Sequence, residues 1–252
     1  MDGFVNTELV NKIGIITFHH PKSNSLPSKI LKEMAEAIFN FSNDENVNVI
    51  VLKSTGGKAF CAGASFDELI MIDNIENGLK FFSGFANVIN NIRKSKKFVI
   101  VSVNGKAIGG GVGLAAAGDY TFAVKNADIK LSEFALGIGP FVVGPAVERK
   151  IGKSAFAQIS TDFDFYSAEW AYNIGLYAVL CENEEELNQK VMEFANKMSA
   201  MSMEATQELK RIFWEGTENW DELLIERAKI SGKLVLSDFT KEYIRKFKEK
   251  NK

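Results

Sequence analysis

The sequence contains few of the side chains that bind metals or crosslink a chain. Its 252 residues include two cysteines, Cys61 and Cys181, and two histidines, the adjacent pair His19 and His20. No spacing among these residues is typical of a zinc site, and adjacent histidines at a strand end point to opposite faces. Two free thiols fit a reducing compartment. We therefore predict no metal site.

Long apolar runs and an excess of charge are also missing. Runs such as residues 98–101 are far too short to cross a bilayer, and residues 1–6 lack a basic region followed by an apolar stretch. The formal net charge is −2, which gives no reason to expect nucleic acid or an anionic membrane surface as a partner. A hydrophobic fraction of 46% and a charged fraction of 25% are typical of a globular chain. We expect a soluble cytoplasmic protein with neither partner.

Strand-like and helix-like apolar patterns alternate along most of the chain. This alternation favours an α/β fold with crossover connections. From about residue 184 onward the pattern is helical only, and we divide the chain into a core, residues 1–195, and a helical region, residues 196–252. The expected elements of the core are a hairpin of strands 4–10 and 14–18, a helix beginning at 25–28, a strand 47–52, a helix 75–93, a strand 98–103, a short helix 112–117, and strands 119–124 and 129–131.

Two turn segments about fifty residues apart each follow an apolar strand. The first is KAFCAGA, residues 58–64, and the second is VNGKAIGGG, residues 103–111. Two such turns can aim unpaired backbone N–H groups at one oxygen, which is how an oxyanion hole is built. About twenty residues later, Glu133 lies among apolar neighbours, where burial would raise its pKa and suit it to general acid–base work. Together these features indicate proton chemistry next to a carbonyl.

Plainer interpretations of the same residues stay open. The glycines at 109–111 could merely permit a tight turn and close helix packing. Residues 111–116 match a dinucleotide-binding fingerprint loosely, but the glycines come well after the strand end. Cys61 is more typical of a small buried filler than of a nucleophile. A single glutamate such as Glu133 is most often solvated surface.

Taken together, these segments resemble the enoyl-CoA hydratase/isomerase family, also called the crotonase superfamily. The resemblance covers nearly the whole chain and includes KAFCAGA, NG followed by GGG, Asp119, the SE pair ending at Glu133, and SAEWA at residues 167–171. It implies a spiral of ββα units with a helical C-terminal trimerisation region, in trimers that commonly pair into hexamers. It also implies an acyl-CoA thioester as substrate, so that coenzyme A is part of the substrate and no separate cofactor is expected.

The resemblance also assigns roles to individual residues. The backbone N–H groups of Ala64 and Gly110 would hold the thioester oxygen, and Glu133 would be the general acid/base. Four phenylalanines, Phe81, Phe82, Phe85 and Phe141, are expected either as walls of the acyl pocket or as plain core. The expected substrate-binding residues are Ala62, Gly63, Ser65, Phe66, Asp67 and Gly109.

One position departs from the family pattern. Hydratases of this family usually carry two glutamates, one matching Glu133 and one at the position that is Gly113 here. The whole-chain resemblance favours hydration of a 2-enoyl-CoA, whereas a single glutamate favours isomerisation of a 3-enoyl-CoA to a 2-enoyl-CoA. Another carboxylate, such as Asp67 or Glu148, could fold into the missing position. A non-catalytic acyl-CoA-binding subunit is the alternative from another class.

Overall fold

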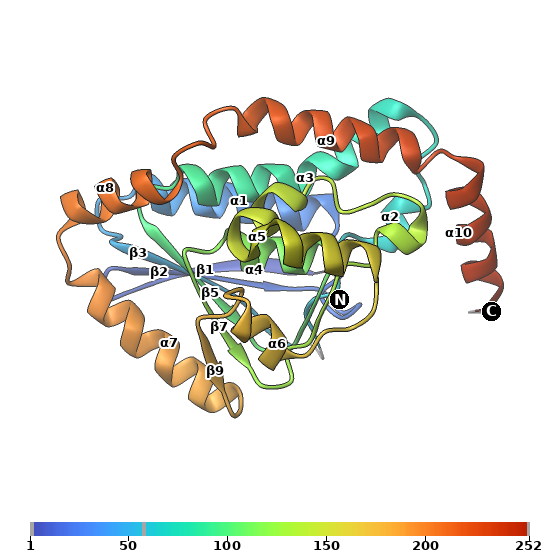
Figure 1. The fold of residues 1–252 in the computed structure, drawn as a ribbon. Coiled ribbons are helices and arrows are strands. Elements are labelled where there is room, and N and C mark those ends of the chain that lie inside the picture. Colours follow the sequence, from blue (N-terminus) through green and yellow to red (C-terminus); the bar gives the residue numbers. More distant parts are fainter. Residues whose placement is uncertain (1–2, 57–58, 251–252) are drawn as a thin grey trace.

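The computed structural model describes residues 3–56 and 59–250, so Lys58 of the first turn segment lies outside the described residues (Figure 1). The chain begins with an antiparallel hairpin of β1 (Phe4–Val10) and β2 (Ile13–His19), as the sequence predicts. Every later strand pairing of the main sheet is parallel. The hairpin therefore forms one edge of a sheet that is otherwise built by crossover connections.

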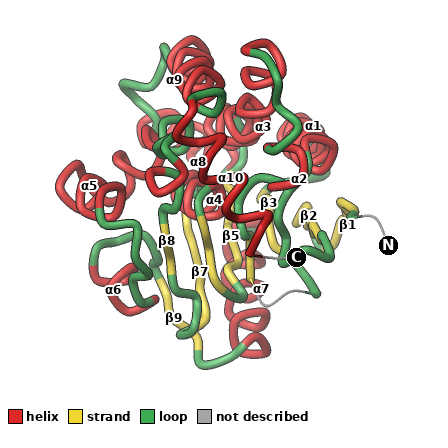
Figure 2. Tube along the Cα trace, turned by 90° about the vertical axis from the view of Figure 1, so that its right-hand side faces the viewer, coloured by secondary structure: helices red, strands yellow, loops and turns green. Residues whose placement is uncertain are grey.

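The main sheet has six strands in the order β1-β2-β3-β5-β7-β9. Helices α1, α3 and α4 cover one face and α7 covers the other, so the central strands are buried on both faces (Figures 1 and 2). The strand predicted at 98–103 is confirmed, the one predicted at 47–52 begins two residues later, and β9 was not predicted. The central and far strands are β3 (Val49–Ser54), β5 (Phe98–Val103), β7 (Tyr120–Val124) and β9 (Val179–Cys181).

A second sheet of three short parallel strands accompanies the main one, in the order β4-β6-β8. Each of its strands follows a strand of the main sheet and precedes a helix, so the chain repeats a ββα unit three times. The spiral that the resemblance implies is therefore present, although β4 and β6 were expected as turns. The strands are β4 (Ala59–Cys61), β6 (Lys106–Ile108) and β8 (Ile129–Lys130).

The core helices follow their apolar stripes. In α1 the residues Ile30, Leu31, Met34 and Ile38 are buried at helical spacing. Helix α3 begins at an asparagine cap, where the Asn74 side chain accepts from the backbone N–H of Asn77. The sequence did not predict α5, whose backbone leaves the helical region at Gly152. The bounds are α1 (Ser28–Asn43), α2 (Phe66–Leu69), α3 (Ile75–Lys94), α4 (Gly110–Ala117), the 3₁₀ helix η1 (Phe134–Leu136), α5 (Gly144–Thr161) and α6 (Ala168–Asn173).

Four further helices form the C-terminal part, as expected from residue 184 onward. Helix α9 runs along α3, and α10 stands at one end of the molecule beside η1 (Figure 1). The boundary drawn at 195/196 falls inside α7, and the division into two regions stays a prediction. None of the helices in the described ranges has the length and hydropathy to cross a membrane. The helices are α7 (Glu184–Ser199), α8 (Met203–Phe213), α9 (Trp220–Leu234) and α10 (Asp238–Lys250).

Candidate active site

The small sheet brings the two turn segments and the Glu133 loop together. Strand β6 lies between β4 and β8, and the Gly109 N–H donates to the Lys130 carbonyl at 2.8 Å. A Cβ atom placed on Gly63 would lie only 3.7 Å from the Gly110 nitrogen. Three loops that are far apart in sequence therefore meet where their strands end.

Two backbone N–H groups at this meeting point have no acceptor in the part of the chain that the structure describes. Gly110 is the first residue of α4, and the first N–H groups of a helix have no intrahelical acceptor. Around Ala64, the Leu26 N–H donates to Gly63 at 2.7 Å and the Ser65 N–H donates to Leu26 at 2.9 Å. Among residues 3–56 and 59–250, neither the Ala64 N–H nor the Gly110 N–H has an acceptor. Both residues line the same cavity, so both donors are available to a bound oxygen.

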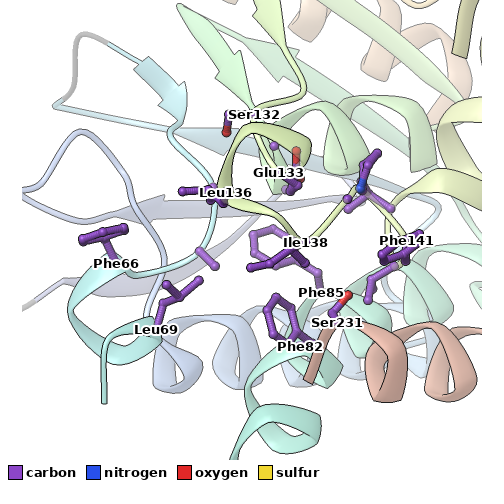
Figure 3. A pocket seen from close by; sticks show the side chains of 18 of the residues that line it. Phe66, Leu69, Phe82, Phe85, Ser132, Glu133, Leu136, Ile138, Phe141 and Ser231 are labelled. Atoms are coloured by element: carbon purple, nitrogen blue, oxygen red, sulfur yellow. The ribbon is translucent and has the colours of Figure 1, made fainter. Parts of the chain in front are cut away.

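The cavity has a volume of about 340 Å³ and mostly apolar walls (Figure 3). Its polar side chains are Ser25, Lys130, Ser132, Glu133, Ser231 and Tyr243. Such a cavity, apolar with a few polar groups, is typical of a small-molecule site. The apolar walls come from α2, from α3 and from residues 136–143, and they include Phe66, Leu69, Phe82, Phe85, Leu136, Ile138, Phe141 and Val143.

Glu133 immediately precedes η1, and the turn after it fixes its backbone. Its carbonyl accepts from the N–H groups of Leu136 and Ile138, both at 3.1 Å. The residue as a whole is half-buried, but its Oε2 atom is fully buried and has no hydrogen-bond partner among the described residues. Burial raises the pKa of this carboxyl to about 7, against the smaller opposing effect of hydrogen bonds from the backbone of Glu133 and Ser132. A carboxyl with this pKa can both accept and release a proton near neutral pH.

The glycine triplet packs without room for side chains. A Cβ atom on Gly110 would lie 2.2 Å from Cζ of Phe85, and one on Gly111 would lie 2.4 Å from the Cys61 carbonyl oxygen. The plainer interpretation of these glycines, that they permit close helix packing, is therefore confirmed. This packing is also what holds the α4 N-terminus, and its positive dipole end, against the cavity.

Within residues 3–56 and 59–250, no carboxylate takes the place of the second family glutamate. A Cβ atom on Gly113 would lie 2.4 Å from Cγ1 of Val143, so an apolar side chain fills the space beside it. Asp67 is exposed and pairs with Lys22, and Glu148 is exposed on α5. Of the described residues that line the cavity, Glu133 alone carries a carboxylate.

The other sequence-predicted residues divide into two groups. Ala62, Gly63, Phe66 and Gly109 line the cavity together with Phe82, Phe85 and Phe141. Ser65, Asp67 and Phe81 do not: the Ser65 hydroxyl caps α2 by accepting from the Glu68 N–H at 3.3 Å, and Phe81 packs in a separate small cluster. Cys61 is buried, which raises the pKa of its thiol to about 12 and leaves it protonated.

Several lining residues were missed by sequence reasoning. Ser231 and Tyr243 come from α9 and α10, about one hundred residues beyond Glu133, and no local pattern marks them. Leu69, Ile138 and Val143 are ordinary apolar residues whose position on the cavity depends on the tertiary fold. Only an alignment or a structure could have identified these five.

Comparison with known proteins decides the family. The model of the enoyl-CoA hydratase/isomerase family matches residues 8–252. The chain belongs to the enoyl-CoA hydratase/isomerase family. It is 31% identical to the short-chain-enoyl-CoA hydratase of Clostridium acetobutylicum, over 97% of this chain and 94% of that protein. It is also 31% identical to the mitochondrial enoyl-CoA hydratase of Pongo abelii, over 96% of this chain and 83% of that protein.

Solved structures of family members have the same fold. The crystal structure of enoyl-CoA hydratase from Bacillus halodurans superposes with a TM-score of 0.88, covering 96% of this chain and 98% of that one at 22% identity. The resemblance and the crotonase-like fold expected from the sequence are thus confirmed. The protein is an enoyl-CoA hydratase/isomerase family enzyme, whereas its individual reaction and the roles of its site residues stay predictions.

Proposed function

We propose that this family member transfers protons on an enoyl-CoA thioester through an enolate, with Glu133 as its acid–base residue. Isomerisation of a 3-enoyl-CoA to a 2-enoyl-CoA is the reaction that the geometry supports best. The observation that carries this proposal is the single carboxylate of the described cavity, with Val143 filling the space beside Gly113. Moving one proton between two carbons needs one base, which both takes it up and returns it.

The steps follow from the arrangement of the groups. The Glu133 carboxylate removes a proton from C2, and the electron pair moves toward the thioester carbonyl, so that negative charge collects on its oxygen. The N–H groups of Ala64 and Gly110 stabilise that oxygen, and losing one donor of this kind costs about 3–4 kcal/mol in comparable sites. Protonated Glu133 then returns the proton at C4, and the double bond shifts to C2–C3. The pKa of about 7 favours both transfers.

Hydration of a 2-enoyl-CoA is the second candidate. It is favoured by the relatives, because two proteins that are 31% identical to this chain over nearly its full length are named enoyl-CoA hydratases. In that reaction Glu133 alone would have to activate the water and supply the proton for C2.

One pair of assays separates the two reactions. Purified protein is mixed with a short 3-enoyl-CoA and, separately, with a short 2-enoyl-CoA, and the absorbance of the conjugated thioester is followed. Appearance of the band from the 3-enoyl-CoA supports isomerisation. Loss of the band from the 2-enoyl-CoA, with hydroxyacyl-CoA as the product and no isomerase activity, would replace isomerisation by hydration.

The variant Glu133→Gln tests the acid–base assignment. It preserves the size of the side chain but cannot carry the proton, so turnover should fall by about 10²–10⁴-fold while binding of a CoA ester is retained. Normal turnover would overturn the assignment of Glu133. Absence of turnover in the wild-type protein, with CoA-ester binding intact, would support the non-catalytic acyl-CoA-binding subunit.

A further inference from the structure

The C-terminal helix is hydrogen-bonded to the turn that carries Glu133. Thr240 in the first turn of α10 is fully buried, and its Oγ1 donates to the carbonyl of Leu136 at 2.8 Å. The same hydroxyl lies 3.1 Å from the carbonyl of Leu234. Because a hydroxyl has only one proton, the shorter contact indicates that Leu136 is the main acceptor. This bond joins residues 104 positions apart in the chain.

The turn that receives this bond has little stability of its own. Helix η1 is a single 3₁₀ turn of three residues, a geometry with poor internal hydrogen bonds. It ends at Gly137, which is left-handed with φ 78°. A Cβ atom on Gly137 would lie 2.4 Å from Cδ1 of Phe239 and 3.0 Å from Oγ1 of Thr240. Helix α10 is thus packed directly against the backbone that follows Glu133.

Apolar contacts extend this attachment to the cavity wall. A small hydrophobic cluster, separate from the main core, includes Ile138 and Val235 and has Leu136 and Ile244 packed against it. Ile138 and Leu136 also line the cavity (Figure 3). Tyr243 of α10 is a further lining residue. Helix α10 packs beside η1. Helix α10 therefore packs against the turn that follows Glu133 and against this small cluster.

We propose that Thr240 is a positioning residue, which holds the Leu136 carbonyl and, through η1, keeps the Glu133 carboxylate in its buried place over the cavity. The inference rests on the proposed function, because it concerns the geometry of the same acid–base group. Without the hydroxyl, the Leu136 carbonyl would lose its buried partner and the turn would have to move to find another. Displacement of a catalytic group by about 1 Å can cost up to about 10²-fold in rate.

Kinetics of matched variants provide the first test. Thr240→Val keeps the shape of the side chain but removes the hydroxyl, and Thr240→Ser keeps the hydroxyl. The control is Thr217→Val, because Thr217 is also buried and its hydroxyl donates to the Trp214 carbonyl at 2.6 Å, away from the cavity. We expect Thr240→Val to lower kcat about tenfold with KM changed less than about twofold, within the range for a displaced catalytic group. Thr240→Ser should restore most of kcat, and Thr217→Val should leave kcat unchanged.

A second readout needs no turnover. The titration of the Glu133 carboxyl is followed by ¹³C NMR of glutamate-labelled protein, with Glu133→Gln to assign the signal. A loosened turn admits water, so the pKa of Glu133 in Thr240→Val should fall from about 7 toward its ordinary value of 4.5. The other titratable side chains lining the described cavity, Lys130 and Tyr243, are unchanged in every variant.

The outcomes separate this inference from the proposed function. An unchanged Glu133 titration in Thr240→Val, or an equal loss of kcat in Thr217→Val, would overturn the positioning role. Lack of turnover in the wild-type protein would count against the proposed function alone, and the NMR titration would still decide the role of Thr240. If thermal melting shows that Thr240→Val does not fold, Thr240→Ala replaces it, since the smaller side chain leaves room for a water beside the Leu136 carbonyl.

Discussion

At the scale of single residues, the pKa of Glu133 predicts how activity depends on pH. Burial raises this pKa to about 7, and the reaction begins with the ionised carboxylate. We expect kcat/KM to be low at pH 5, to rise about tenfold per pH unit toward pH 7 and to level off above it. The measurement is a profile of kcat/KM from pH 5 to pH 9. An inflection near the ordinary glutamate value of 4.5, or a flat profile, would contradict the prediction.

A stability measurement checks the same shift without any substrate. Between 4.5 and about 7 the folded protein holds a proton on Glu133 that the unfolded chain releases. The contribution of Glu133 to the free energy of unfolding is therefore fully present below pH 4.5, and it is lost as the pH rises through about 7. Glu133→Gln removes this titration. The free energy of unfolding of the variant minus that of the wild type should therefore be larger at pH 8 than at pH 4.5.

The sequence located Glu133 but could not establish its environment. Its apolar neighbours suggested burial, yet Phe134 beside it is largely exposed. The carboxyl lies instead against Gly109 of a distant loop, where a Cβ atom would be 3.0 Å from Oε1 of Glu133. The absence of a second glutamate was visible at Gly113. That Val143 fills the resulting space depends on how α4 and α5 pack, which no local pattern reveals.

At the scale of elements, α8 is attached to the sheet by a buried ion pair. Asp119, just before β7, accepts from the Lys210 ammonium at 2.5 Å, from the Trp214 indole at 3.1 Å and from the Val99 N–H at 2.7 Å. The side chains of Asp119 and Lys210 are only 5% and 3% exposed. Burial lowers the pKa of Lys210, and Asp119 opposes that shift.

Removing one member of this pair should be costly. Lys210→Met removes the ammonium that forms the ion pair with the buried Asp119 carboxylate and leaves it only the weaker attraction of Arg149 and Lys150, so we expect the free energy of unfolding to fall by about 3–5 kcal/mol. The measurement is urea denaturation at pH 7. Arg211→Met on the same helix is the control, because its pairs with Glu208 and Glu215 are exposed and screened by solvent, so their loss should change the free energy of unfolding far less. Equal losses in the two variants would show that α8 does not depend on the buried pair.

Element prediction succeeded where one periodicity persisted for long enough. The α3 helix, which has a long apolar stripe, was predicted to within one residue of its end, and β5 was predicted at both ends. Strands β4 and β6 have three residues each, too few to show a period, and they were expected as turns. Gly152 interrupts the stripe of α5, which was therefore missed. Of the missed strands, β4 and β6 are the ones that join the loops of the site, whereas β9 lies at the far edge of the main sheet.

At the scale of the whole molecule, the site draws on all three ββα units and on the C-terminal helices. The first unit supplies Ala64, the second Gly110 and the third Glu133, while α9 and α10 close the cavity with Ser231 and Tyr243. The order of the units could be inferred from the sequence through the resemblance. The packing of the C-terminal helices against the units could not be inferred. An apolar stripe predicts that one face of a helix is buried, but it does not identify the surface that buries it.

The apolar stripe of α8 is exposed in the single chain, and this exposure is relevant to the predicted trimer or hexamer. On α8, the stripe residues Leu209, Ile212 and Phe213 are 45%, 50% and 45% exposed. A homotrimer, or a hexamer of paired trimers, remains the predicted state, and we expect this face of α8 to be buried in it because exposed apolar side chains gain from burial. Ile212→Glu should then shift the protein to monomers in sedimentation velocity. Met71→Glu, at an equally apolar position that is 75% exposed beside α2, should leave the assembly intact. A wild-type monomer would contradict the predicted assembly, and an Ile212→Glu trimer would place its contacts elsewhere on the surface.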